Sequence, residues 1–462
     1  MKEILDINEL KHYKHIHMIG IGGISMSGIA EILKNWGFTV TGYDATPSEI
    51  TEKLISHGIP VTYDNDLSNL HTADIVVYTA AIKPDNPWLV ESRNMNIPTI
   101  ERKDFLGIIT NSYINTIGIS GTHGKTTTTS MVSLCFLEEG LDPTIQVGAI
   151  LKQLDGNYRV GNSNNLIIES CEYAESFLKF HLKSAIILNI DNDHLDYFKT
   201  FENIKKAFIK YVEKLPANGF LVLNADDKSC LELISHTKSN CITYGIENKE
   251  ADYIAQNITF DKNGFATFDV YKKNDFYGTI SLSVAGIHNV SNALSCIALC
   301  DSYNISYVSI KKALLNFTGA NRRLEYIGTC NGASVYDDYG HHPTEIEATT
   351  NAINKKDFNE SWVIFQPHTY SRTKNHLNDF AKVLSRFDNI IVTDIYAARE
   401  INTFGISSED LANKIIELGK KAIYIPDFKK ISEYIKANVH ENDIVLTLGA
   451  GTVVNISKML VE

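Results

Sequence analysis

Short apolar runs alternate with longer amphipathic stretches along nearly the whole chain of 462 residues. The runs are rich in Ile and Val, and most are followed by Gly, Ser or Asp and then by a helical pattern. They lie at residues 16–21, 75–78, 116–119, 166–168, 185–190, 220–223, 362–365, 389–393 and 443–448. Parallel strands that are covered by helices produce this pattern. The pattern therefore predicts an α/β protein built on parallel sheets.

The length corresponds to about three domains at roughly 150 residues each. A transition between a first and a second unit is predicted at residues 98–112, and another boundary near residues 317–321. Three domains are therefore expected, at residues 1–111, 112–319 and 320–462.

One segment departs from the alternating pattern. Residues 251–284 read as alternating strands with a turn at residues 261–264, which predicts an antiparallel addition to the middle domain. The last domain is expected to start with a strand at residues 333–336.

Composition excludes several classes of protein. Lys and Arg total 43 and Asp and Glu total 55, so the net charge is −12 and the chain has no overall attraction to nucleic acid or anionic lipid. No apolar run approaches the roughly 18 residues that span a bilayer, and the polar start lacks a signal-peptide core. Seven scattered Cys without a CxxC pair are typical of reduced thiols. We expect a cytoplasmic protein without membrane insertion or a nucleic-acid partner.

A glycine-rich turn follows the first predicted strand. Gly20, Gly22 and Gly23 lie before a helical stretch in a pattern close to GxGxxG, with Ser25 in the third glycine position. Such glycines let a pyrophosphate approach the backbone N–H groups at a helix start. Asp44 ends the next strand, 24 residues after Gly20, where it can hold a ribose hydroxyl. A dinucleotide is the ligand that this element favours by itself, but a UDP-sugar has the same pyrophosphate and ribose, and a merely structural turn remains an alternative.

A second glycine-rich loop predicts a triphosphate site. It follows a strand, precedes a helix, and shares only the end of the GxxxxGK[ST] pattern, because Gly121 lies three residues before Gly124. Backbone N–H groups would cradle the phosphates, Lys125 would reach the β and γ oxygens, and the Thr126 hydroxyl would ligate Mg²⁺. The candidate ATP-binding residues of this loop are Gly121, Thr122, His123, Gly124, Lys125, Thr126 and Thr127.

Acidic and imidazole groups follow two later strands. Glu169 ends one predicted strand, and His194 follows another. In a parallel sheet these ends lie beside the phosphate loop, so Glu169 is a predicted Mg²⁺ ligand with Thr126, and His194 a predicted ligand of a second metal. Glu172 is the rival to Glu169. The structural alternatives are a capping role for His194 and a solvated loop position for Glu172.

Several further stretches, together with the two glycine-rich loops, resemble one family over nearly the whole chain, the Mur ligases of peptidoglycan synthesis. Three of them are most similar to the branch of that family that adds L-alanine. The stretches are Glu169–Tyr173, Gly286–Asn292, Asn321–Glu325, Tyr336–Glu345, Phe365–Thr373 and Ile395–Glu400, of which the last three resemble the alanine-adding branch.

The resemblance implies a fold and a reaction. The fold has a Rossmann-like UDP-binding domain, a P-loop ATPase domain and a second Rossmann-like domain that binds the amino acid. ATP, L-alanine and UDP-N-acetylmuramate would give ADP, phosphate and UDP-N-acetylmuramoyl-L-alanine through an acyl phosphate, with Mg²⁺, in two ions, as cofactor. Within this frame the first glycine-rich turn would hold UDP rather than a dinucleotide.

The resemblance also implies roles for residues outside the loops. Asn289 and Asn292 would contact the adenine of ATP, and Asp337 would bind the ATP ribose or hold the lysine and histidine side chains. Lys125 and Arg323 would neutralise the phosphates. Arg372 would clamp the α-carboxylate of the amino acid, and one of the adjacent His341 and His342 would orient or deprotonate its amine. The candidate catalytic residues are Lys125, Arg323, His341, His342 and Arg372.

The sequence departs from the family at a few positions. Some members have Gly where Ser25 stands, and Arg where Thr369 stands, which would shift carboxylate binding toward Arg372. Related ligases use a carbamylated lysine for the second metal. Lys205, Lys206 and Lys210 lie near the expected position, and the sequence does not assign one of them to it.

Three other functions are compatible with part of the sequence. A ligase that attaches a murein tripeptide to the same UDP-sugar is the nearest rival. An NAD-dependent oxidoreductase would explain Gly20–Ser25 but not Gly121–Thr127. A non-enzymatic nucleotide-gated switch would bind ATP without substrate-dependent hydrolysis.

Overall fold

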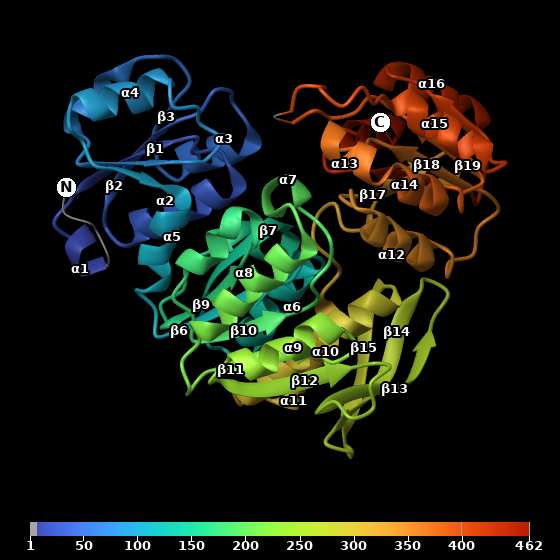
Figure 1. Ribbon diagram of the computed structural model, residues 1–462, viewed down its shortest axis with the longest axis horizontal. Helices are drawn as coiled ribbons and strands as arrows, with labels where there is room; N and C mark the ends of the chain where they lie inside the picture. Colours follow the sequence, from blue (N-terminus) through green and yellow to red (C-terminus); the bar gives the residue numbers. More distant parts are fainter. Residues whose placement is uncertain (1–6, 399, 462) are drawn as a thin grey trace. The chain divides into compact units, whose positions relative to one another are not determined.

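The computed structural model describes residues 7–398 and 400–461. The described residues form two compact units. Unit 1 comprises residues up to 254 with 272–274 and 293–313, and unit 2 comprises residues 255–271, 275–292 and those from 314 onward. Both units are built from sheets with helices packed on them (Figure 1). Within the described residues, every helix is too short or too polar to cross a bilayer.

The N-terminal part of unit 1 is a parallel sheet. Its strands are β1 (His15–Ile19), β2 (Thr39–Tyr43), β3 (Val61–Thr62), β4 (Ile75–Tyr78) and β5 (Thr99–Glu101). Its helices are α1 (Ile7–Leu10), α2 (Ile24–Asn35), α3 (Glu49–Ser56), the 3₁₀ helix η1 (Leu67–Thr72), α4 (Pro87–Asn94) and α5 (Arg102–Thr110). The strand order is β3-β2-β1-β4-β5, so the chain turns outward in both directions from β1. Ligands of open parallel sheets bind at the strand ends beside such a reversal of order.

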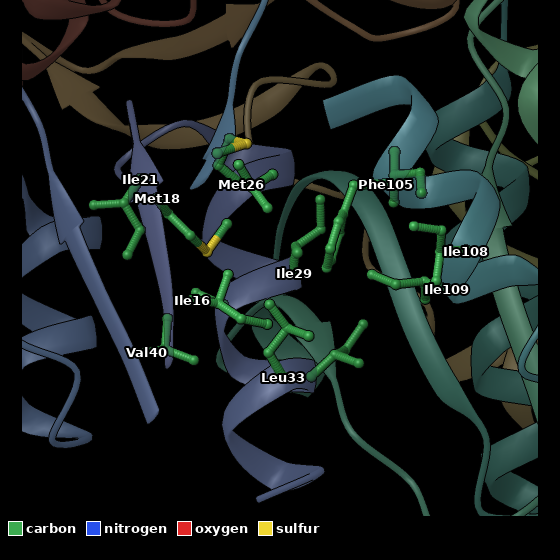
Figure 2. Close-up of a cluster of buried hydrophobic side chains, with 14 of the residues drawn as sticks. Ile16, Met18, Ile21, Met26, Ile29, Leu33, Val40, Phe105, Ile108 and Ile109 are labelled. Carbon is green, nitrogen blue, oxygen red and sulfur yellow. The ribbon is translucent and has the colours of Figure 1, made fainter. Parts of the chain in front are cut away.

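Apolar side chains from β1, α2 and α5 meet in one buried cluster (Figure 2). Ile16 and Met18 come from β1, Ile29 and Leu33 from one face of α2, and Phe105 from α5, and none is more than marginally exposed. Burying a side chain of this size stabilises a fold by about 1.5–3 kcal/mol. This cluster fixes α2 on the sheet and so fixes the glycine-rich turn that joins β1 to α2.

The rest of unit 1 is built on a second sheet. Its strands are β6 (Asn115–Ser120), β7 (Thr144–Leu151), β8 (Gly156–Arg159), β9 (Asn165–Glu169), β10 (Ser184–Ile187), β11 (Phe220–Asn224) and β12 (Asn240–Gly245). Its helices are α6 (Lys125–Glu138), η2 (Lys152–Leu154), η3 (Tyr173–Lys179), α7 (Leu195–Phe198), α8 (Phe201–Glu213), α9 (Lys228–Glu232) and η4 (Leu233–His236). The order is β12-β11-β10-β6-β9-β7-β8, and only the β7–β8 pair is antiparallel among these described strands. Since β6 lies between β9 and β10, the carboxyl ends of these three strands meet at one edge.

The predicted antiparallel addition is confirmed. It consists of β13 (Tyr253–Phe260), β14 (Phe265–Lys272) and β15 (Asp275–Ala285), in the order β15-β14-β13. The Asp261 backbone N–H donates to the Phe265 carbonyl at 3.0 Å, and Gly264 has a φ of +75°, which closes the turn predicted at residues 261–264. Helices α10 (Ile287–Ser302) and α11 (Tyr307–Asn316) follow.

Unit 2 ends with a third sheet. Its strands are β16 (Glu325–Cys330), β17 (Ala333–Asp338), β18 (Ser361–Phe365), β19 (Asn389–Val392), β20 (Ala422–Tyr424) and β21 (Ile444–Leu448). Its helices are α12 (Pro343–Ile353), α13 (Tyr370–Asn375), α14 (Leu377–Leu384), α15 (Ser408–Glu417), α16 (Phe428–Asn438) and α17 (Val454–Val461). The order is β16-β17-β21-β18-β19-β20, with β16 antiparallel to β17 and the other neighbours parallel.

The prediction that the last domain starts with the strand at residues 333–336 is wrong, because another strand precedes it. The strand predicted at residues 333–336 is β17, and β16 precedes it. The register of β16 shifts between Tyr326 and Gly328, and most of its side chains are partly exposed. A bulged edge strand of this kind has no continuous apolar run, which is why the pattern does not reveal it.

Candidate active site

The phosphate loop joins β6 to α6. Gly121 has a φ of +132°, and a Cβ at this position would lie 3.0 Å from the Leu188 Cβ and 3.1 Å from Asn189 backbone atoms. Gly124 is the left-handed residue directly before α6, with a φ of +85°. The loop therefore requires glycine at both ends, and it presents the N-terminus of a 14-residue helix, where backbone N–H groups favour an anion.

Lys125 turns back into this loop. Its Nζ donates to the carbonyls of Gly121 at 2.5 Å and Thr122 at 3.0 Å, and it lies 2.9 Å from Glu172 Oε2. Burial is the largest single influence and would lower the pKa of Lys125, but Glu172, together with Cys171 and Glu169, raises that pKa above its ordinary value. The ammonium therefore remains charged at neutral pH inside the protein.

Glu169 lies at the carboxyl end of β9, beside the loop. Its Oε2 accepts from the Thr126 hydroxyl at 2.9 Å and from the Gly148 backbone N–H at 2.8 Å. A carboxylate and a hydroxyl at this separation are hard oxygen donors of the kind that Mg²⁺ prefers. The structure therefore brings the predicted pair of Mg²⁺ ligands together.

His194 lies near the same edge, in the residue before α7. Its backbone is left-handed, with a φ of +55°, and its Nε2 lies 3.9 Å from Glu172 Oε1 and 3.7 Å from Asp193 Oδ2. Glu172 is 2% exposed, so it is not the solvated loop residue considered above. Its two oxygens face Lys125 and His194.

Two residues that order the loop were not predicted. Asn189 receives the His123 N–H on Oδ1 at 2.8 Å and donates from Nδ2 to the His123 carbonyl at 3.0 Å. Asp191 accepts at 3.0 Å from His123 Nε2, and its N–H donates to the Thr122 hydroxyl at 2.8 Å. Both follow β10, a strand next to β6, and that position is the signal that points to them.

The first glycine-rich turn is closed by Asp44. Gly20 has a φ of +78°, and a Cβ there would lie 2.6 Å from the Thr79 Cγ2. The Gly22 N–H donates to Asp44 Oδ2 at 2.8 Å, and the Ala45 N–H donates to Oδ1 at 2.8 Å. Asp44 thus orders the turn in addition to its predicted contact with a ribose, which stays a prediction.

Ser25 connects this turn to the second sheet of unit 1. Its Oγ accepts from Arg102 Nη1 at 3.1 Å and from Gln146 Nε2 at 2.8 Å, and Gln146 lies on β7. Asn157 on β8 donates to the Ile24 carbonyl at 2.5 Å. Where a glycine would allow a close backbone approach, Ser25 forms part of a junction between two sheets, and the sequence pattern gave no signal for Gln146 or Asn157.

In unit 2, Asp337 lies inside the third sheet. It is fully buried, its Oδ2 lies 2.9 Å from Arg322 Nε, and its Oδ1 accepts from the Thr447 hydroxyl at 2.6 Å. Burial raises the pKa of Asp337 although Arg322 opposes the shift. Both oxygens of Asp337 serve internal contacts, and its expected contact with ATP stays a prediction. Arg322, its ion-pair partner, was not among the candidates.

His341 and His342 differ in their surroundings. His341 donates from Nδ1 to the Tyr339 carbonyl at 3.1 Å, so a neutral His341 carries its lone pair on Nε2. His342 is buried and caps α12, because its Nδ1 accepts from the Thr344 N–H at 3.4 Å. The lone pair of His342 is therefore committed to the helix, whereas that of His341 is directed elsewhere.

The predicted arginines lie near this pair. The Arg323 guanidinium lies 3.9 Å from Glu345 Oε1 and 5.4 Å from the centre of the Tyr339 ring. The guanidinium of the neighbouring Arg322 lies 5.0 Å from the centre of the same ring. Arg372, on α13, donates from Nη1 to His368 Nδ1 at 3.1 Å. The His368 ring lies 5.5 Å from that of His341, so the structure connects Arg372 to His341 through one side chain. His368 stands in the stretch Phe365–Thr373 but was not singled out.

The two predicted adenine contacts begin α10. Asn289 donates from Nδ2 to the Ala285 carbonyl at 2.8 Å and accepts at Oδ1 from Asn292 Nδ2 at 3.1 Å. Both side chains are largely buried. Their contact with adenine stays a prediction.

Comparison with known families accounts for this geometry. Profiles described as the Mur ligase family catalytic domain, the Mur ligase middle domain and the Mur ligase glutamate ligase domain match residues 15–114, 119–300 and 322–451. A UDP-N-acetylmuramate–L-alanine ligase of Acetivibrio thermocellus is 48% identical over 460 residues, which cover 100% of this chain and 98% of the relative. The chain belongs to the Mur ligase family.

Other comparisons of this Mur ligase agree. A UDP-N-acetylmuramate–L-alanine ligase of Clostridium perfringens is 44% identical over 97% of the chain and 98% of the relative. The crystal structure of a UDP-N-acetylmuramate-alanine ligase from Thermotoga maritima matches with a TM-score of 0.83 and 30% identity, over 97% of this chain and 98% of that one. A murein peptide ligase from Psychrobacter arcticus matches with a TM-score of 0.72 at 24% identity and 97% and 98% coverage, which shows the shared fold. The expected three-domain α/β fold is confirmed.

Proposed function

We propose that this Mur ligase joins L-alanine to the lactyl carboxylate of UDP-N-acetylmuramate at the expense of ATP. The products are UDP-N-acetylmuramoyl-L-alanine, ADP and phosphate, made in the synthesis of a peptidoglycan precursor. The observation that carries the proposal is full-length identity of 44–48% to ligases of that name, in a chain whose phosphate loop keeps Lys125 charged and enclosed. ATP and UDP-sugars are cytoplasmic metabolites, so we assign the enzyme to the cytoplasm.

The reaction needs activation of a carboxylate. An amine does not displace oxygen from a carboxylate at neutral pH, because the leaving group is poor. Transfer of the γ-phosphoryl group to the lactyl carboxylate gives an acyl phosphate, and attack of the amine then expels phosphate. Two anions must approach each other in the first step, so the protein has to supply positive charge and alignment.

The environment of Lys125 supports a role in that step. Its ammonium is held by Glu172 and by two loop carbonyls, beside the N-terminal N–H groups of α6. When the β- and γ-phosphates occupy the loop, the ammonium exchanges loop carbonyls for phosphate oxygens while Glu172 continues to position it.

The residues around the loop fit Mg²⁺. Thr126 and Glu169 offer hard oxygens 2.9 Å apart, and we assign the first ion to them. Glu172 and His194 are the candidates for a second ion. Bound Mg²⁺ would shield the charge of the phosphate oxygens. Mg²⁺ binding and the number of ions are part of the proposal.

We assign the substrates to the three expected domains. The glycine-rich turn of residues 1–111 receives the UDP diphosphate at the start of α2. Gly20 and Gly22, where neighbouring side chains leave no room for a Cβ, both lie in this turn. Residues 112–319 bind ATP. Residues 320–462 bind L-alanine, with Arg372 on its carboxylate and His341 as the acceptor of the amine proton, since the Nδ1 contact of His341 leaves the lone pair on Nε2.

One assay tests the proposal. The enzyme is mixed with ATP, Mg²⁺ and UDP-N-acetylmuramate, and ADP release is measured with L-alanine, glycine, L-serine or the murein tripeptide as the amine. We expect release with L-alanine that depends on the UDP-sugar. Preference for the tripeptide would assign the chain to the murein peptide ligases, and ATP binding without substrate-dependent hydrolysis would indicate a nucleotide switch.

A further inference from the structure

Three thiols converge in the interior of unit 1, away from the proposed active site. Cys135 lies on α6, and Cys296 and Cys300 lie four residues apart in the C-terminal part of α10. All three are fully buried. Cys135 is ten residues beyond Lys125, or about 15 Å along the helix.

The spacing of the three sulfurs matches that of ligands around one ion. Sγ of Cys296 lies 3.6 Å from Sγ of Cys135 and 3.8 Å from Sγ of Cys300, and all three lie within 4.8 Å of one another. Metal–sulfur bonds are about 2.3 Å long, so three sulfurs in a plane around an ion are separated by about 4 Å, and by less when the ion is pyramidal. Small side-chain shifts suffice to place one ion among them.

The geometry of the helices explains why the sulfurs meet. Side chains at positions i and i+4 share one face of a helix, which aligns Cys296 and Cys300. The Lys312–Glu138 ion pair of 2.6 Å and the Ser306 hydroxyl bond to Glu139 of 2.8 Å hold the last turn of α6 against the segment that follows α10. Cys135 is thereby presented to the other two thiols.

The charge balance selects the kind of ion. The sequence neighbours Phe136, Ile297 and Leu299 are fully buried and apolar, and the charged group that acts on Cys135 is an anion, Glu138. Three thiolates around a monovalent ion would bury a net charge of −2, and around a divalent ion −1. Around a trivalent ion the complex is neutral, and burying a neutral group avoids the desolvation cost of an ion.

We propose that Cys135, Cys296 and Cys300 form a binding site for a trivalent thiophilic ion, with arsenite as its simplest source. Three S–H groups and As(OH)₃ exchange three As–O bonds for three As–S bonds and release three water molecules. Arsenic remains trivalent, so the step needs no oxidant or reductant. A disulfide between two of the thiols would instead require an oxidant and would leave the third thiol unused.

Burial of the three thiols determines how fast an ion can reach them. Because the thiols are fully buried, access requires local opening of the helices, and binding should be slow.

The test uses the full-length folded enzyme, reduced with a phosphine that does not compete as a dithiol. After incubation with arsenite and gel filtration, arsenic per chain is measured by mass spectrometry, and its sulfur neighbours are counted by X-ray absorption. We expect about one arsenic per chain with three sulfur neighbours, and loss of that arsenic in Cys135→Ala and in Cys296→Ala. Cys330→Ala, which removes a buried thiol of the third sheet, should bind as the wild type does.

Other results would overturn the proposal. These are two sulfur neighbours, retention of arsenic in folded Cys135→Ala, or absence of arsenic from the folded wild type while the unfolded chain binds it. Thermal unfolding of each variant reports whether it folds, and the sulfur count of the wild type decides the question even where a variant does not. The readouts are independent of the ligase reaction.

Discussion

The Nζ of Lys125 and the Oε2 of Glu172 lie 2.9 Å apart, and the carboxylate is 2% exposed. A buried pair of this kind costs desolvation energy, and removal of one partner leaves an uncompensated charge. Glu172 faces His194 with its other oxygen, at 3.9 Å. One carboxylate therefore positions Lys125, the lysine that we propose binds phosphate, and also offers a ligand toward the second proposed metal position.

Replacement of Lys125 should remove catalysis and leave UDP-sugar binding intact. Lys125→Ala removes the ammonium assigned to the β- and γ-phosphates, so we expect turnover to fall by at least about 10³-fold. Steady-state ADP release measures turnover, and calorimetry measures UDP-N-acetylmuramate binding. Lys262→Ala, at an exposed lysine of the turn after β13, is the matched control and should be fully active. Near-normal turnover of Lys125→Ala would contradict the assignment of ATP binding to this loop.

Replacement of Glu169 should increase the Mg²⁺ requirement. An amide is a poorer ligand for a hard cation than a carboxylate, so Glu169→Gln should need more Mg²⁺ for half-maximal activity. His194→Ala should show a similar change if His194 holds a second ion. Glu247→Gln, at an exposed position, serves as the control. An unchanged Mg²⁺ titration of His194→Ala would make His194 a structural residue.

Replacement of His341 should lower activity, whereas replacement of the adjacent His342 should lower stability. His341→Ala should lower turnover by about 10²–10⁴-fold, the range for loss of a general base. His342→Ala should destabilise the fold by about 1 kcal/mol, the usual cost of an N-cap, and His342→Asn should largely restore stability because Asn caps well. Turnover and thermal unfolding of all three variants are compared. If His342→Asn is folded and inactive while His341→Ala turns over normally, the assignment must be reversed.

Most strands of the core could be predicted from the sequence because they are buried on both faces. The apolar runs coincide with β1, β4, β6, β9, β10, β11, β18, β19 and β21 to within three residues at each end. The strands that the pattern did not reveal include β3, β8 and β16, which lie at sheet edges and have half-exposed side chains. An edge strand packs one face only and tolerates bulges, so its sequence carries a weaker signal.

In the candidate site, too, some residues have a clear sequence signal and others do not. The loop around Lys125 and the strand-end Glu169 were found because backbone sterics and strand position restrict the residue type. The buried contact of Asp337 with Arg322 was not predicted, because an acidic residue at the end of a strand looks the same in sequence whether it faces a ligand or an internal cation. Gln146 acts through Ser25, 121 residues away, and no local pattern predicts such a contact.

Stability should decrease with acidity because of His17. This residue is fully buried on β1, stacks on Trp88 at 4.7 Å, and bonds through Nδ1 to the Thr41 hydroxyl at 2.9 Å. Burial, and then the neighbouring His15, lower the pKa of His17 to about 3. The unfolded chain takes up this proton near pH ~6.5, so between these values the unfolded state binds more protons. The free energy of unfolding should fall by about 1.4 kcal/mol per pH unit below ~6.5 from this residue alone.

His17→Phe checks this contribution, because a phenyl ring can keep the stacking without titrating. Urea unfolding over the window from neutral to about pH 4 should give a smaller pH slope for the variant than for the wild type. His236→Gln, at an exposed histidine, should leave the slope unchanged. An equal slope in His17→Phe would assign the acid sensitivity to other groups.

The fate of a carboxylate oxygen tests the proposed intermediate. If the lactyl carboxylate attacks the γ-phosphorus, one of its oxygens becomes the bridging oxygen of the acyl phosphate, and amine attack at the acyl carbon expels that oxygen with phosphate. UDP-N-acetylmuramate labelled with ¹⁸O in the carboxylate should therefore transfer one label to each phosphate released, which mass spectrometry detects. An adenylating ligase would transfer the label to AMP, and an ATPase that uses water would transfer none. We expect the first outcome, because the roles proposed for Lys125 and Thr126, at the start of α6, put positive charge at the β and γ end of the nucleotide, where ADP leaves. Unlabelled phosphate from a competent reaction would rule out the acyl phosphate even if L-alanine and the UDP-sugar are the substrates.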